Sequence, residues 1–135
     1  MTFMVWNDKL SVGVKAIDDD HKVLLGLANK LWDSITAERG KQVLDDILDE
    51  LVKYTTYHFE REEQLFAYTS YPDASEHKKQ HDDLTKRVLE IQKRYREGAP
   101  ALTLEVMNFL KDWLYDHILR SDVRFGPYLN SKGIK

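Results

Sequence analysis

The sequence predicts an all-α protein, an antiparallel up-down-up-down four-helix bundle with an extended N-terminal arm. Apolar residues recur at three- and four-residue steps through four long segments, which is the period of an amphipathic helix. Glycine and proline clusters separate these segments, and no stretch shows the alternating pattern of a strand. Because the predicted connections are short, consecutive helices must run antiparallel.

Composition narrows the class of protein further. A chain of 135 residues is expected to form one domain over 1–135, and 42% hydrophobic with 32% charged residues is ordinary for a globular protein. The net charge of -3 gives no electrostatic support for a nucleic-acid partner. The absence of cysteine excludes disulfides and thiolate metal sites. With no secretory signal and no membrane-spanning apolar run, we expect a cytoplasmic protein that is free of membranes.

The first two predicted elements are the arm and helix one. Residues 1–17 mix apolar residues with Gly13 and show no helical period, so we expect an extended arm packed on the bundle surface. Asp18-Asp19-Asp20 offers a capping side chain and negative charge for a helix start. The apolar period then predicts a helix over about 18–39, which ends at Gly40.

Three further helices follow, each bounded by turn residues. The second is predicted over 41–67, and Pro72 forbids its continuation. The third spans 74–97 and ends at Gly98-Ala99-Pro100. The fourth spans 101–121, and Gly126-Pro127 is expected to stop it and leave a short C-terminal tail.

The residues that carry chemistry lie on the inner faces of these helices. His58-x-x-x-Glu62 and His77-x-x-x-His81 each place two ligand atoms on one face of a helix, because residues four apart lie one above the other. In an antiparallel bundle, the start of helix one, the end of helix two, the start of helix three and the end of helix four meet at one end. All five histidines therefore converge there: His21, His58, His77, His81 and His117.

A lone histidine on an apolar face is more often a hydrogen-bonded core residue than a metal ligand. Five converging imidazoles beside Glu62 are a different case, because the buried rings and carboxylate would have too few hydrogen-bond donors among them. Each buried polar group left without a partner costs about 1–3 kcal/mol. A bound metal removes that cost. Asp122 follows His117 by five residues, and steps of about 100° place it off the same face. Either the last turn widens into a π-type bulge or Asp122 reaches in from a helix end.

The number and type of donors favour two metal ions. Seven candidate ligands are too many for one zinc, and imidazole with carboxylate suits iron, copper, nickel or zinc. If two six-coordinate metals share both carboxylates and one solvent oxygen, about eleven of twelve positions are filled. One position then stays open for a small ligand such as O2.

This pattern of ligands resembles the hemerythrin family, and specifically the single-domain bacteriohemerythrins. The resemblance covers nearly the whole chain, including Lys111-Asp112-Trp113-Leu114 before His117 and Gly126-Pro127-Tyr128-Leu129 after it. Asp20 departs from the family pattern, which more often has Gln or Glu there. The full set of residues that carries the resemblance is His21, His58, Glu62, His77, His81, His117 and Asp122.

The resemblance implies a non-haem di-iron protein that binds dioxygen reversibly, for O2 storage, delivery or sensing. Two iron ions per chain, joined by an oxo or hydroxo bridge, would be the cofactor. Oxygen would bind end-on at the iron with the vacancy and be held as a hydroperoxide. The implied roles are His77, His81 and His117 on the filled iron, His21 and His58 on the open iron, and Glu62 and Asp122 as bridging carboxylates.

An apolar pocket around bound oxygen is expected from Leu24, Phe59 and Leu114, which lie near the histidines in the sequence. Ordinary core packing explains these three residues equally well. The rival functions are a di-iron oxidase or peroxidase and an O2- or NO-sensing module. No second acid–base pair is evident near the site, which favours a carrier over an enzyme. The partners expected are dioxygen and an O2-consuming enzyme or a signalling protein.

Overall fold

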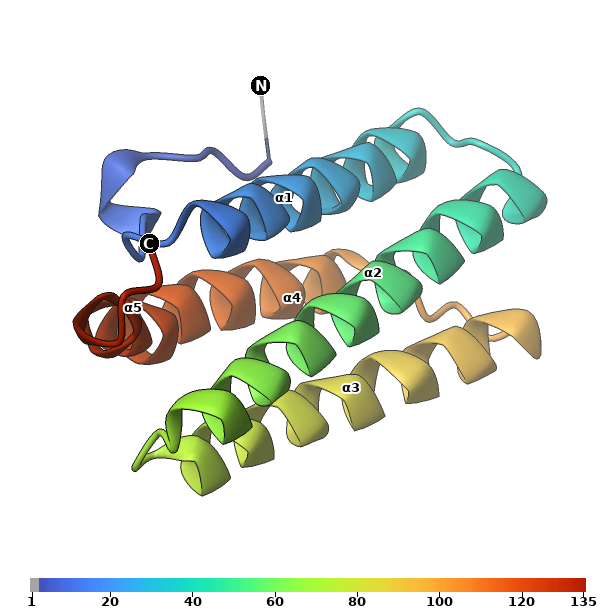
Figure 1. The fold of residues 1–135 in the computed structure, drawn as a ribbon. Coiled ribbons are helices and arrows are strands. Elements are labelled where there is room, and N and C mark those ends of the chain that lie inside the picture. The colour runs from blue at the N-terminus through green and yellow to red at the C-terminus, as the bar shows by residue number, and fades with distance from the viewer. Residues whose placement is uncertain (1–2) are drawn as a thin grey trace.

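The computed structural model describes residues 3–135, and it is an antiparallel bundle of four long helices (Figure 1). The predicted all-α bundle is thereby confirmed, and no strand occurs within residues 3–135. None of the helices in this range is long and apolar enough to cross a bilayer. In chain order the elements are η1 (Asp8–Leu10), α1 (Lys15–Thr36), α2 (Lys41–Thr69), α3 (Ala74–Arg96), α4 (Leu104–His117), η2 (Ile118–Asp122) and α5 (Val123–Ser131).

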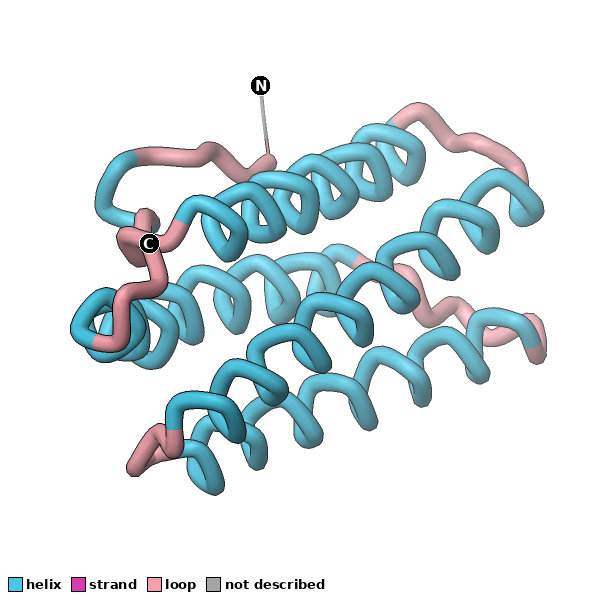
Figure 2. Tube along the Cα trace, in the orientation of Figure 1, coloured by secondary structure: helices cyan, strands magenta, loops and turns pink. Residues whose placement is uncertain are grey.

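Short loops join the long helices at alternate ends of the bundle (Figure 2). The loop after α2 begins at Ser70, whose backbone is left-handed with φ 53° and whose N–H donates to the Phe66 carbonyl. Thr103 caps α4, because its side-chain oxygen accepts a hydrogen bond from the Val106 N–H at 3.2 Å. Because the loops are short, α1 and α3 begin at the end of the bundle where α2 and α4 finish (Figure 2).

The first helix begins earlier than predicted, and Asp18 does not cap it. α1 starts at Lys15 after Val14, which makes no side-chain capping bond. Asp18 lies in the first turn, where its carboxylate accepts from the Val12 N–H at 2.8 Å and the Ser11 hydroxyl at 2.6 Å. The predicted cap is wrong because the carboxylate satisfies donors of the arm instead.

The arm is more than a surface segment. It includes the 3-10 turn η1, and Met4 and Val12 are almost fully buried. Met4 belongs to an apolar cluster with Leu114 and Ile118, whereas Val12 belongs to a second cluster with Phe125. The arm therefore closes the bundle over the helix ends that carry the histidines. Residues 1–2 of the predicted arm lie outside the described residues.

Gly126-Pro127 does not stop the last helix, which corrects the sequence prediction. α5 continues through both residues to Ser131. A Cβ added at Gly126 would lie 1.7 Å from the Val12 carbonyl oxygen, so the glycine permits the arm to cross the helix closely. Pro127 has no N–H to donate, but the burial of Phe125 and Leu129 on either side holds the helical path.

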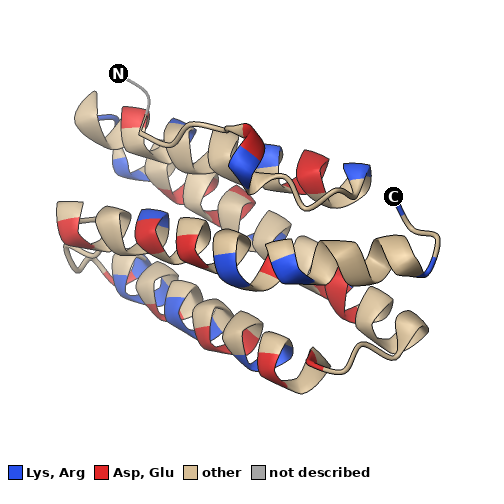
Figure 3. Ribbon diagram, turned by 90° about the vertical axis from the view of Figure 1, so that its left-hand side faces the viewer, with Lys and Arg blue, Asp and Glu red and all other residues tan. Residues whose placement is uncertain are grey.

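The apolar core surrounds a polar layer. The largest cluster fills the space between α1, α2, α3 and α4 and includes Leu24 and Phe59. A second cluster contains Phe66 and Phe125, whose rings lie next to His77, on the side of the histidines away from the main cluster. Charged residues of both signs are distributed along the helices, as Figure 3 shows. The buried histidines and carboxylates thus lie between apolar clusters.

Candidate metal centre

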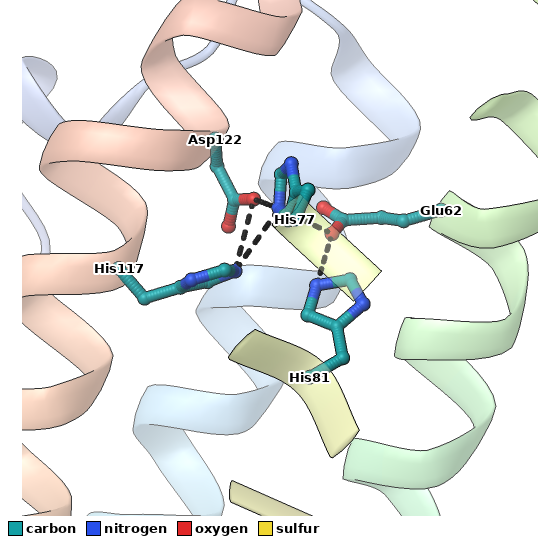
Figure 4. A group of neighbouring side chains, drawn as sticks. All are labelled: Glu62, His77, His81, His117 and Asp122. Carbon is teal, nitrogen blue, oxygen red and sulfur yellow. Dashed lines mark hydrogen bonds and ion pairs between the residues drawn. The ribbon is translucent and has the colours of Figure 1, made fainter. Parts of the chain in front are cut away.

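The structure brings all seven predicted side chains together in two adjacent groups that share Glu62 and Asp122 (Figure 4 shows the larger group). Within each group, the potential ligand atoms lie within 4.8 Å of one another. All seven side chains are buried, and the most exposed, His117, is 6% accessible. The larger group contains Glu62, His77, His81, His117 and Asp122, and the smaller contains His21, His58, Glu62 and Asp122.

Glu62 and Asp122 each direct one carboxylate oxygen to each group. Towards the larger group, Asp122 Oδ1 lies 2.7 Å from His77 Nε2, and Glu62 Oε1 lies 3.0 Å from His81 Nε2. Towards the smaller group, Asp122 Oδ2 lies 3.1 Å from His21 Nε2, and Glu62 Oε2 lies 3.2 Å from His58 Nε2. Two carboxylates with this orientation can each bridge a pair of metal ions.

The π-helical segment η2 supplies the rotation that Asp122 requires. The Val123 N–H donates to the Ile118 carbonyl, which is the five-residue spacing of a π-helix. This wider turn brings Asp122 onto the inner side with His117, and Asp122 Oδ1 lies 3.3 Å from His117 Nε2. Of the two explanations open from the sequence, the π-type bulge is the one that the structure shows.

Several atoms of the site have no hydrogen-bond partner, and this indicates that a cation belongs there. A buried polar atom without a partner costs about 1–3 kcal/mol. His77 Nε2 and His117 Nε2 lie only 3.1 Å apart, which suits two donors to one ion. The unpartnered atoms of the predicted ligands are His21 Nδ1 and Nε2, His58 Nε2, both oxygens of Glu62, His81 Nε2 and Asp122 Oδ1. This set of imidazole nitrogens and carboxylate oxygens fits iron or a similar transition metal.

Without metal, the site is held by ion pairs. Burial and the nearby Asp122 carboxylate oppose ionisation of Glu62, but the charge of the neighbouring His58 keeps the pKa of Glu62 well below its usual value. Burial likewise disfavours charge on His58, yet Glu62 and Asp20 raise the pKa of His58 to about 10. Cations are therefore favoured between the two carboxylates, and a metal ion would displace protons there.

In three of the five histidines, the N–H of the outer ring nitrogen, Nδ1, donates a hydrogen bond to a fixed acceptor. Such a bond places the proton on Nδ1 and leaves Nε2 free for a metal, and it fixes the ring orientation. The three pairs are His58 Nδ1 with Asp20 Oδ2 at 2.9 Å, His81 Nδ1 with Glu63 Oε2 at 3.1 Å and His117 Nδ1 with Gln80 Oε1 at 2.8 Å.

Sequence reasoning missed Glu63 and Gln80, and it noted Asp20 only as a departure from the family pattern. Each of these residues stands directly beside a predicted ligand in the chain, which is a usable signal. Adjacency alone does not identify the histidine that each contacts. Asp20 and Gln80 contact histidines on other helices, 38 and 37 residues away in the chain.

Aromatic rings cover the outer faces of the imidazoles. Phe59 stacks on His81, with ring centroids 3.9 Å apart and planes 5° from parallel. Trp113 stacks on His117 at 4.5 Å and 17°. Phe59 was expected beside His58, but their centroids are 6.1 Å apart, so its closer ring contact is with His81.

The three residues expected to form the oxygen pocket are all buried. Leu24 and Phe59 belong to the main apolar cluster, whereas Leu114 belongs to the cluster of the arm. Their burial agrees with ordinary core packing as well as with a pocket. Their role around a bound ligand stays a prediction.

Comparison with known proteins supports the family suggested by the sequence. The family model described as the hemerythrin HHE cation binding domain matches residues 12–129. The bacteriohemerythrin of Stenotrophomonas maltophilia is 33% identical over 131 residues, which are 97% of this chain and 84% of that protein. The bacteriohemerythrin of Methylococcus capsulatus is 32% identical over 136 residues, which are 97% of this chain and 100% of that protein.

Solved structures agree. A wild-type hemerythrin superposes with a TM-score of 0.88 at 32% identity, covering 94% of this chain and 98% of that one. A leucine-to-tyrosine variant of hemerythrin gives a TM-score of 0.91 at 31% identity, with 96% and 98% covered. The family model, the sequence relatives and the fold therefore agree, and this chain belongs to the hemerythrin family.

Proposed function

We propose that this protein is a non-haem di-iron protein that binds dioxygen reversibly. The observation that carries the proposal is the orientation of Glu62 and Asp122, whose two oxygens face two different groups of histidines. Family membership and the donor set favour iron as the metal. The bacteriohemerythrin names of the relatives support oxygen as the ligand.

The two groups are unequal, and this inequality gives the site its open position. His77, His81 and His117 would hold one iron, and only His21 and His58 would hold the other. Glu62 and Asp122 would bridge the two ions. The iron beside His21 and His58 therefore has one protein donor fewer, so we place the oxygen-binding position there. The bound irons would supply the reversible redox chemistry.

The residues around the ligands favour a carrier or sensor over an enzyme. Asp20 and Glu63 are carboxylates next to the site, and each already accepts a hydrogen bond from a ligand histidine. Both carboxylates are therefore already engaged in orienting ligand histidines. The apolar clusters on either side of the site would limit the access of water, and so would protect a bound oxygen from protonation and loss. Sensing would additionally require a partner protein.

The test combines metal analysis with the visible spectrum of the purified protein. We expect two irons per chain, a colourless form after anaerobic reduction, and charge-transfer bands that appear in air and disappear when oxygen is removed. A Glu62→Gln variant is the control, because it keeps the volume but loses a bridging charge. Irons that oxidise without a persistent oxygenated spectrum would favour an oxidase or peroxidase instead. One zinc or no metal would refute the proposal.

A further inference from the structure

The outer partner of His117 differs from those of the other paired histidines. His58 and His81 donate to carboxylates, whereas His117 donates to the neutral amide of Gln80 at 2.8 Å. The same Gln80 Oε1 accepts a second hydrogen bond from the Ser121 hydroxyl at 2.6 Å. Ser121 lies in η2, so one amide oxygen joins α3, α4 and the π-helical segment.

The chemistry of the site determines how this amide must point. If the amide nitrogen of Gln80 faced His117, it would donate to Nδ1 and leave the ring proton on Nε2. That proton would then block the metal-facing nitrogen. With the oxygen facing inward, Nδ1 carries the proton and Nε2 is available. The Ser121 hydroxyl donates to the same oxygen and favours this orientation.

We propose that Gln80 is a positioning residue for the metal centre: it holds His117 in the ligating tautomer and couples that ring to the η2 segment that presents Asp122. This inference rests on the proposed function, since it assumes that His117 and Asp122 bind metal. Asp122 Oδ1 lies 3.3 Å from His117 Nε2, so the two groups coupled through Gln80 meet at the same point.

The neutral charge of Gln80 has a second consequence. A carboxylate acceptor increases the electron donation of an imidazole to a metal more than an amide does, because a charged acceptor makes the stronger hydrogen bond. His117 would therefore donate less electron density to a bound metal than His58 or His81. The amide keeps the reduction potential of the adjacent iron higher than a carboxylate at position 80 would.

The location of Gln80 determines which variants are informative. Its side chain is only partly buried, and it lines surface pockets between α3 and η2 together with Glu76, Ser121 and Arg124. Truncation to alanine would admit a water that could accept the His117 proton. Gln80→Met keeps most of the volume and removes the acceptor, whereas Gln80→Glu keeps the acceptor and adds charge.

Gln92 provides a matched control on the same helix. It is buried, and its amide nitrogen donates to Asp49 at 3.1 Å, in the part of α3 nearer its C-terminus. Gln92→Met therefore removes a glutamine hydrogen bond from α3 without touching the metal centre. It accounts for any general effect of the substitution on folding.

The experiment titrates each metal-free protein anaerobically with Fe²⁺ and with Zn²⁺, and then measures the reduction potential of the iron-loaded form. We expect Gln80→Met to weaken binding by about 10–100-fold, the usual effect of losing an outer partner of a ligand. Gln80→Glu should bind metal as tightly as the wild type, because it keeps an acceptor for His117, and it should have a lower reduction potential. Gln92→Met should change neither quantity.

The outcomes separate this inference from the proposed function. Wild-type protein that binds two ions, together with Gln80→Met that binds them equally well, would overturn the role of Gln80 alone. Wild-type protein that binds no metal would overturn both. If metal-free Gln80→Met is unfolded by circular dichroism, the potential of Gln80→Glu decides. A potential equal to that of wild type refutes the inference, and a lower one supports it.

Discussion

Glu62 and Asp122 face each other across the buried site, and each turns one oxygen towards the group that contains three histidines and the other towards the group that contains two. Glu62 comes from the C-terminal part of a regular α-helix, whereas Asp122 comes from a π-helical turn. The matched orientation therefore arises from two different backbones. It gives two metal ions a shared pair of bridges and an unequal set of remaining donors.

Removing one bridging charge should abolish the paired site. We expect Glu62→Gln to bind at most one iron per chain and to show no oxygen-dependent visible band, because an amide is a poor bridge between cations. Glu63→Gln is the control: it removes a carboxylate charge beside His81 and Lys78 but keeps an acceptor for His81 Nδ1, so two irons should still bind. The measurement is metal content with the spectrum in air. Two tightly bound irons in Glu62→Gln would contradict the bridging role.

Removing the metal should destabilise the fold. The buried carboxylates and imidazoles lose their common partner, and a ligand present at about 100 times its Kd stabilises the native state by about 2.7 kcal/mol. We expect a lower Tm after chelation and recovery when Fe²⁺ is restored anaerobically, as measured by calorimetry. Equal Tm values with and without metal would show that the cluster is satisfied by its ion pairs alone.

Adding a side chain at Gly126 should separate the arm from α5. A Cβ there would lie 1.7 Å from the Val12 carbonyl oxygen, so Gly126→Ala requires the backbone to shift, at a cost of about 1–3 kcal/mol. Gly26→Ala is the control, because nothing lies within 4 Å of the added atom inside α1. That variant should gain about 0.5–1 kcal/mol through helix propensity. Denaturant unfolding measures the free energy of unfolding of both variants. An equal change in the two variants would contradict the close crossing of the arm over α5.

The carboxylate of Asp18 should hold the arm in place. Asp18→Ala removes the acceptor for the Val12 N–H and the Ser11 hydroxyl, and we expect a loss of about 1–3 kcal/mol. The Val12 amide should also exchange faster with deuterium. Asp19→Ala serves as the comparison, since Asp19 forms only an exposed ion pair with Lys15, and its loss should leave stability nearly unchanged. Unchanged exchange at Val12 in Asp18→Ala would rule out the anchoring role.

A buried leucine near the site should protect bound oxygen from water. We expect Leu114→Ala to accelerate autoxidation of the oxygenated protein, since the smaller side chain admits water to the centre. Leu110→Ala is matched in burial, at 4% exposed against 6% for Leu114, and belongs to the main apolar cluster. Its autoxidation rate should stay near that of wild type. An unchanged rate in Leu114→Ala would remove it from the pocket, leaving Leu24 and Phe59 as candidates.

The sequence by itself determined the helices and the residues that converge. Helical periodicity and turn residues are local properties, so the four helices and their antiparallel order follow from spacing alone. The i, i+4 spacing of His58 with Glu62 and of His77 with His81 places each pair on one inner face. Even the irregular position of Asp122 was detectable, because five residues after His117 do not fit a regular helix.

Only the tertiary structure decided the contacts between distant parts of the chain. Asp18 and Gly126 resembled an ordinary cap and an ordinary stop, but the arm around Val12 gives both a different role. Gln80 was one polar residue among many until the fold placed it against His117, 37 residues away. Which oxygen faces which histidine, and which histidine has which outer partner, depends on how the helices pack. The local sequence pattern contains no information on that packing geometry.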